Sequence, residues 1–253
     1  MGRLRDIAWT VREVLFRRPK GFWRYRLAEW LTARIDPEYK FSEHGRTYLR
    51  DQEFLDWYRI HVSNTTYRCL DRKYTVDQLM RLVVGLEGDT AECGVYKGAM
   101  SWLMCQRIRG TGKRHHAFDS FAGLSTPSSD DGAYWQAGDM SMAESQARDC
   151  LREFDFVDFH TGWIPERFGE VADRKFSFVH IDVDLYQPTY DSLAFFYERL
   201  VPGGLIVCDD YGFTNCPGAK RAFDEFFADK PEPVLLLTTG QSVVFRQAAS
   251  ATS

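Results

Sequence analysis

Three aspartates, Asp182, Asp209 and Asp210, follow two apolar runs and have the chemistry of a cation site. The runs, residues 176–181 and 203–208, have the length and the β-branched and aromatic content of buried strands. Carboxylate oxygens are the ligands that Mg²⁺ and similar cations prefer. Without a cation, the three charges would repel one another and push one carboxyl toward protonation. The sequence therefore predicts a divalent-cation site, and the alternative is that water solvates the two strand ends.

Asp184 lies two residues after Asp182, and two roles are open to it. On an extended backbone the two carboxylates would point to the same side of the strand. Alternatively, Asp184 caps the helix predicted over residues 188–200, in which Pro188 is acceptable in the first turn.

Two strands that both end in acids predict an open parallel sheet, because ligands of such sheets bind outside the carboxyl ends of the strands. Residues 89–108 read as a further strand, a glycine turn and a helix, with Glu92, Gly94 and Gly98 in or beside the turn. Glycine lets a backbone approach a ligand closely, and a helix N-terminus offers free N–H groups. The spacing is neither GxGxxG nor a phosphate loop with GK[ST]. The segment is therefore either a cofactor loop or an ordinary strand-to-helix turn.

Asp119 ends the next predicted strand, within residues 115–124, about twenty-five residues after the glycine turn. In nucleotide-binding folds an acid at this place accepts the ribose hydroxyls. Its other possible role is that of an N-cap or turn residue, which the neighbouring Ser120 and Gly123 also fit. Together, the glycine turn and the spaced acid favour an adenosyl ligand.

The remaining elements complete an α/β domain with a helical N-terminal part. Apolar spacing predicts a helix over residues 4–15 and another that begins at Thr75. Residues 126–139 form a polar loop that could act as a lid, and residues 141–144 fit the capping box of a helix that ends near Phe154. Further on come a strand over residues 156–163, a tight turn at 202–204, a helix over 217–229 and an antiparallel hairpin over 234–245. His160, near the end of the third strand, could be a base, a ligand contact or a structural residue.

Composition excludes several classes of protein. The net charge of −4 argues against a general nucleic-acid binder. The six cysteines contain no CxxC pair, so we expect reduced core cysteines in a cytoplasmic protein. No apolar stretch is long enough for a transmembrane segment. The basic, amphipathic N-terminus is expected to pack on the protein or on a second subunit; the alternative is contact with an anionic membrane.

Six blocks of sequence in the same order resemble the macrocin O-methyltransferase family of metal-dependent class I methyltransferases. The blocks are AECGVYKGAMS, FDSFAGL, GWIPERF, VHIDVDLYQPTYDSL, LVPGGLIVCDDYG and CPGAKRAFDEF, and the resemblance covers residues 74–245. It implies a Rossmann-like, seven-stranded, mostly parallel sheet with an antiparallel hairpin at its edge. A helical cap over residues 1–88 is then expected to shape the acceptor site, and residues 89–247 to bind the cofactor. The aromatic face of the N-terminal helices favours a homodimer or a higher homo-oligomer.

The resemblance also implies the reaction and its residues. S-Adenosylmethionine is the expected methyl donor, and a hydroxyl of a sugar, on a natural-product glycoside or a surface polysaccharide, is the expected acceptor. The implied ligands of Mg²⁺ or a similar cation are Asp182, Asp209 and Asp210. The implied cofactor-binding residues are Glu92, Gly94, Gly98, Ser101, Asp119 and Ser120. Asp182 is the first candidate for the general base, followed by His180, Asp184 and His160. The alternatives are a catechol-type methyltransferase and a non-catalytic binding or assembly protein.

Overall fold

The structure is a computed structural model that describes residues 22–35, 47–62 and 69–248. The chain divides into two compact units, residues 1–57 and 58–253. The first unit contains α2 (Phe22–Thr32), the 3₁₀ helix η2 (Thr47–Arg50) and the start of α3 (Gln52–His61). The helix expected over residues 4–15 lies outside the described residues, and the division of function at residue 88 stays a prediction.

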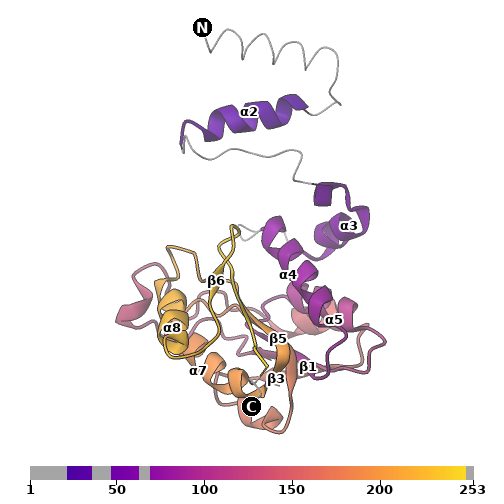
Figure 1. Cartoon of the computed structure of the whole chain (residues 1–253), viewed down its shortest axis with the longest axis vertical. Helices are drawn as coiled ribbons and strands as arrows, with labels where there is room; N and C mark the ends of the chain where they lie inside the picture. The colour runs from indigo at the N-terminus through magenta and orange to yellow at the C-terminus, as the bar shows by residue number, and fades with distance from the viewer. Residues whose placement is uncertain (1–21, 36–46, 63–68, 249–253) are drawn as a thin grey trace, which may run out of the picture. The chain divides into compact units, whose positions relative to one another are not determined.

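The second unit is built on a seven-stranded sheet, and it contains all the elements that form the site (Figure 1). Its strands are β1 (Asp89–Cys93), β2 (His115–Asp119), β3 (Val157–Thr161), β4 (Phe176–Ile181), β5 (Leu200–Cys208), β6 (Leu235–Leu236) and β7 (Ser242–Phe245). Their order in the sheet is β3-β2-β1-β4-β5-β7-β6. The first five pair in parallel, while β7 pairs antiparallel with both β5 and β6. The predicted sheet and its edge hairpin are confirmed.

Helices cover both faces of the sheet. One layer contains α4 (Leu70–Val83), α5 (Ala99–Ile108) and α6 (Glu144–Leu151), and the other contains α7 (Tyr186–Phe196) and α8 (Pro217–Phe227) (Figure 1). The described part of this unit also includes the short 3₁₀ helices η3 (Ser129–Asp131), η4 (Phe168–Val171) and η5 (Tyr197–Arg199). Every residue of β1 and β4 is buried, as expected of central parallel strands covered on both faces.

Three local predictions were wrong. Helix α4 begins at Leu70 rather than Thr75. The capping box over residues 141–144 does not form, because α6 begins at Glu144 with Ala143 at its N-cap and no side-chain hydrogen bond. A capping box forms instead in the loop, where Ser128 and Asp131 cap η3. Residues 202–204, predicted as a tight turn, lie inside β5.

Gly94 fixes how closely β1 approaches β4 at the edge that carries the site. Its φ is +88°, and a Cβ at this position would overlap the backbone carbonyl oxygen of Asp182. The amide of Asp182 donates to the Cys93 carbonyl at 2.8 Å, so the two segments cannot separate without loss of that bond. Only glycine fits here, which explains one of the two glycines of the turn in packing terms.

We expect Gly94→Ala to destabilise the protein by about 3 kcal/mol or more, because a backbone clash is added to an unfavourable φ. Gly110→Ala is the matched control, since Gly110 has a φ of +78° but a Cβ at this position would meet nothing within 4 Å. The control should cost only about 1–2 kcal/mol, the penalty of the left-handed conformation alone. Urea denaturation measures both values, and equal losses would contradict the packing argument.

Among the described residues, no helix has both the length and the hydropathy of a membrane-spanning segment.

Candidate functional site

A cavity of about 380 Å³ lies at the carboxyl ends of the parallel strands. Each of these strands contributes to its wall. The lining includes Glu92 of β1 and the glycine turn after this strand, Asp119 at the end of β2, residues 162–164 after β3, residues 182–185 after β4, and Asp209 and Asp210 after β5. Arg72 and Lys73 of α4 also line it. The predicted cation-binding and cofactor-binding segments therefore share one cavity.

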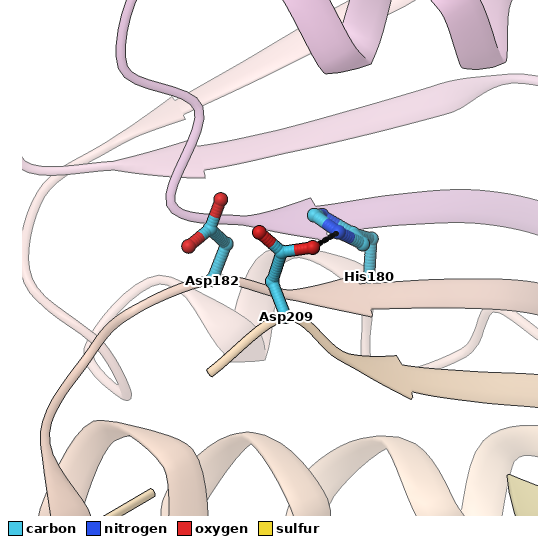
Figure 2. A group of neighbouring side chains, drawn as sticks. All are labelled: His180, Asp182 and Asp209. Carbon is cyan, nitrogen blue, oxygen red and sulfur yellow. Dashed lines mark hydrogen bonds and ion pairs between the residues drawn. The ribbon is translucent and has the colours of Figure 1, made fainter. Parts of the chain in front are cut away.

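Asp182, Asp209 and His180 form one compact group at this edge (Figure 2). Each can offer one ligand atom such that the atoms lie within 4.8 Å of one another. Asp209 is held in place, because its Oδ1 accepts a hydrogen bond from Gln241 Nε2 at 2.6 Å and lies 3.3 Å from His180 Nε2. The carboxylate of Asp182 makes no hydrogen bond to the described residues, so both of its oxygens stay available on the cavity wall.

Asp210 belongs to a second group, with Asp184 and Cys216. Its Oδ2 accepts a hydrogen bond from the amide of Asp184 at 3.0 Å. Burial, together with the nearby carboxylates of Asp184 and Asp182, raises the pKa of Asp210 well above its usual range. Burial and the neighbouring Asp182 raise the pKa of Asp184 to about 7. This is the behaviour expected of several carboxyls crowded into one buried site.

Asp182 and Asp184 both line the cavity, although an extended strand does not join them. Strand β4 ends at Ile181, and Asp184 has a φ of +61°, so the backbone that joins the two acids is not extended. Nor does Asp184 cap α7, because Leu185 is the N-cap residue and Asp131 Oδ1 accepts the amide hydrogen of Tyr186. The capping role considered for Asp184 was therefore wrong.

Sequence reasoning missed Arg72, which makes an ion pair with Asp209. Its Nη2 also donates to the Asp209 carbonyl at 3.0 Å and lies 3.7 Å from Asp210 Oδ1. The guanidinium carbon lies 4.4 Å from the ring centroid of Phe213, a cation–π contact. Nothing in the spacing of the sequence links Arg72 to acids more than a hundred residues later.

The turn after β1 is organised by Asp119. Its Oδ2 accepts hydrogen bonds from the amides of Val95 and Tyr96, each at 2.8 Å, and its Oδ1 accepts one from the amide of Phe121 at 2.7 Å. The turn role considered for Asp119 is therefore observed, and of about four acceptor positions on a carboxylate about one is left for a ligand. Ser120 serves its own turn: its hydroxyl accepts from the amide of Ala122 and donates to the Gly123 carbonyl, both at 3.1 Å.

Glu92 connects the two halves of the site through a buried network. Its carboxylate accepts a hydrogen bond from the Ser101 hydroxyl and lies 3.1 Å from His180 Nδ1. His180 reaches Asp209 with its other nitrogen, so these buried side chains join the start of α5 to the acids after β5. Gly98, the other glycine of the turn, is the N-cap of α5 with a φ of +82°.

His160 takes no part in this cavity. Its Nδ1 lies 2.7 Å from Glu170, and its Nε2 lies 3.1 Å from Nδ1 of His116. Burial lowers the pKa of His160, which favours its neutral form. Of the roles considered for this residue, the structural one fits these contacts.

The profile of the family described as Macrocin-O-methyltransferase (TylF) matches residues 31–239. The chain belongs to this family. It is an S-adenosylmethionine-dependent O-methyltransferase with a class I methyltransferase fold, as the sequence blocks predicted.

Individual relatives agree with this assignment. The chain is 28% identical to the demethyldecarbamoylnovobiocin O-methyltransferase of Streptomyces niveus, over 85% of this chain and 88% of the relative. It is 27% identical to an enzyme of Streptomyces olivaceus, the 8-demethyl-8-(2,3-dimethoxy-alpha-L-rhamnosyl)-tetracenomycin-C 4'-O-methyltransferase, over 66% and 69%. Among solved structures, the O-methyltransferase NovP superposes with a TM-score of 0.60 at 26% identity, over 71% of this chain and 81% of NovP.

Proposed function

We propose that this enzyme methylates a hydroxyl of a sugar, carried by a natural product or a surface polysaccharide, with the help of a divalent cation. The observation that carries the proposal is the group formed by Asp182, Asp209 and His180 in the same cavity as the glycine turn (Figure 2). The names of two relatives support the acceptor class, since one acts on a rhamnosyl group and another is the mycinamicin III 3''-O-methyltransferase of Micromonospora griseorubida.

The donor set fits a hard divalent cation. Asp182, Asp209 and Asp210 offer carboxylate oxygens at one edge of the sheet, as Mg²⁺ prefers. The site also attracts positive charge, because the guanidinium of Arg72 already contacts Asp209. A cation bound by these residues would orient the acceptor oxygen and lower its pKa.

The chain's own residues position the reactants and handle the proton. In the transfer, the acceptor oxygen forms a bond to the methyl carbon while the bond from that carbon to sulfur breaks, and the hydroxyl proton must leave. Asp182 has a carboxylate on the cavity wall that is free of hydrogen bonds to the described residues, so it can accept this proton. The network from Glu92 through His180 to Asp209 fixes the distance between the cofactor turn and the acids.

For the cofactor we assign the residues around the turn. Asp119 shapes the turn and keeps about one acceptor position for a ribose hydroxyl. Glu92 and Gly94, which line the cavity, are assigned to the methionine end of the cofactor, and Gly98 is assigned through the helix start that it caps. Ser101 holds Glu92 in place by a hydrogen bond, and Ser120 stabilises the turn after β2 by its hydrogen bond to the Gly123 carbonyl.

The proposal is tested by calorimetry and by an acceptor screen. We expect S-adenosylmethionine and its demethylated product to bind with micromolar affinity. In assays with Mg²⁺, rhamnosides that carry vicinal hydroxyls should be methylated in preference to planar diphenols, and a chelator should stop the reaction. Preference for diphenols would favour a catechol-type enzyme, and full activity in the chelator would remove the cation from the proposal.

A further inference from the structure

Arg72 lies where two of the predicted cation ligands meet. It sits in the first turn of α4, with only 16% of its side chain exposed, and its partners lie in the turn that follows β5. Its Nη2 contacts the carboxylate and the backbone carbonyl of Asp209, and the same nitrogen lies 3.7 Å from Asp210 Oδ1. One side-chain cation therefore spans both acids that follow β5.

These contacts use the same oxygens that an ion would need. A divalent cation such as Mg²⁺ binds carboxylate oxygens at about 2.0–2.1 Å and demands a nearly complete shell of oxygen ligands. Oδ1 of Asp209 already accepts a hydrogen bond from Gln241 and lies 3.3 Å from His180 Nε2. The oxygen left for an ion is therefore Oδ2, which is paired with Arg72. A guanidinium and a divalent ion cannot both occupy this position, and their like charges repel.

The hydrogen bonds of the Arg72 guanidinium do not use all of its donors. Among the described residues, Arg72 Nε is buried without a hydrogen-bond partner. Its planar group also lies over the ring of Phe213, which lines the same cavity. A side chain with one unsatisfied donor and an aromatic surface beside it can give up the carboxylates and keep part of its contacts.

We propose that Arg72 and a divalent cation compete for Asp209 and Asp210. Without the ion, the guanidinium of Arg72 offsets the negative charge of the two carboxylates; when the ion binds, the guanidinium moves away from them. This inference rests on the cation site of the proposed function. It makes Arg72 a positioning residue: it keeps the acids from repelling one another, and it weakens the affinity of the enzyme for the ion. It also implies that ion binding changes the wall of the cavity that receives the acceptor, because Arg72 and Phe213 both line it.

The test is the calorimetric affinity of the whole chain for Mg²⁺ and Mn²⁺, without acceptor, for the wild type and Arg72→Met. Methionine keeps much of the length and removes the charge. We expect the variant to bind the ions about tenfold more tightly or better, because no cation has to be displaced. Arg81→Met is the matched control on the same helix: Arg81 is 55% exposed and 3.9 Å from Asp77, so its loss should leave the affinity unchanged.

Thermal unfolding provides a second measurement. Without divalent ions, Arg72→Met should unfold at a lower temperature than the wild type, because the acids lose their counter-charge. Saturating Mg²⁺ should then raise its unfolding temperature more than that of the wild type. Arg72→Lys, which keeps the charge and so protects folding, should show an ion affinity between the two.

The outcomes separate this inference from the proposed function. Equal or weaker ion binding by Arg72→Met and Arg72→Lys, with ion binding by the wild type, would overturn the competition and leave the cation site standing. Absence of ion binding in all the proteins, with S-adenosylmethionine still bound, would remove the cation site and the competition together.

Discussion

Asp182→Asn is expected to abolish most methyl transfer while the fold and the binding of S-adenosylmethionine are retained. The substitution is nearly isosteric and removes one negative charge. The Asp182 carboxylate makes no hydrogen bond to the described residues, so the change leaves the hydrogen bonds of the folded site in place. Loss of a general base and of a cation ligand should lower kcat on the order of a hundredfold or more.

The physical reason is the position of Asp182. Its carboxylate lies in one group with Asp209 and His180 (Figure 2), on a cavity that also contains the cofactor turn. By contrast, Asp209 is tied to Gln241 and Arg72, so its replacement would disturb several contacts at once. Asp182 therefore gives the cleaner test of the chemistry.

The measurement is a steady-state assay beside calorimetry of the cofactor. Asp229→Asn is the control, because Asp229 is 81% exposed and its ion pair within the described part of the chain is with its neighbour Lys230. We expect the control to match the wild type in kcat, in cofactor affinity and in unfolding temperature. An Asp182→Asn enzyme with wild-type kcat would rule out both roles that we assign to Asp182.

The sequence was sufficient for the acids because their context is local. An apolar run followed by aspartate identifies a strand end, and the parallel topology then brings Asp182, Asp209 and Asp119 to one edge of the sheet. The same reasoning could not predict the direction of each side chain. Asp184 adopts a positive φ, which aspartate tolerates better than most residues but which no spacing rule reveals.

The residues that hold the acids could not be predicted, because they come from distant parts of the chain. Arg72 precedes β1, and Gln241 lies in the edge hairpin, yet both contact Asp209. Arg72 also explains the wrong start of α4. Arg72 and Lys73, in the first turn of this helix, lie on the wall of the cavity, so this turn adds little to the apolar periodicity that marked Thr75 as the start.

The capping box expected at residues 141–144 failed for a tertiary reason. Met140 has a φ of +66°, and the amide of Met142 donates to the Phe121 carbonyl at 3.2 Å. The segment before α6 is thus held by the turn after β2, so Ser141 does not take the N-cap position. Local pattern identified the helix, and a long-range contact decided where it begins.

Asp119→Ala is expected to cost both cofactor binding and stability, and Asp119→Asn to cost less of each. The carboxylate accepts amide hydrogens from Val95, Tyr96 and Phe121, so alanine leaves three donors without their partner. Each buried donor left unpaired costs about 1–3 kcal/mol where water cannot replace the carboxylate. Tyr96 has a φ of +50°, a conformation that needs such support from its surroundings.

Asparagine distinguishes the two functions of Asp119. Its single carbonyl oxygen can still serve Val95 and Tyr96, while its NH₂ group cannot accept the amide hydrogen of Phe121. We therefore expect Asp119→Asn to fold and to bind S-adenosylmethionine on the order of tenfold more weakly, and Asp119→Ala on the order of a hundredfold or more. Calorimetry of the cofactor and urea denaturation measure the two effects on the same samples.

Asp139→Asn is the matched control for this series. Asp139 also accepts a loop amide, that of Gln136 at 2.8 Å, but it does not line the cavity. Its replacement should lower stability modestly and leave cofactor affinity unchanged. If Asp119→Ala kept wild-type affinity, the turn after β1 would not depend on Asp119, and the cofactor would have to be held by other residues of the cavity. If cofactor affinity falls for Asp119→Asn and falls further for Asp119→Ala, the carboxylate that closes the turn also determines the strength of cofactor binding, because an ordered turn holds its cavity-lining residues in place for the ligand without further entropic cost.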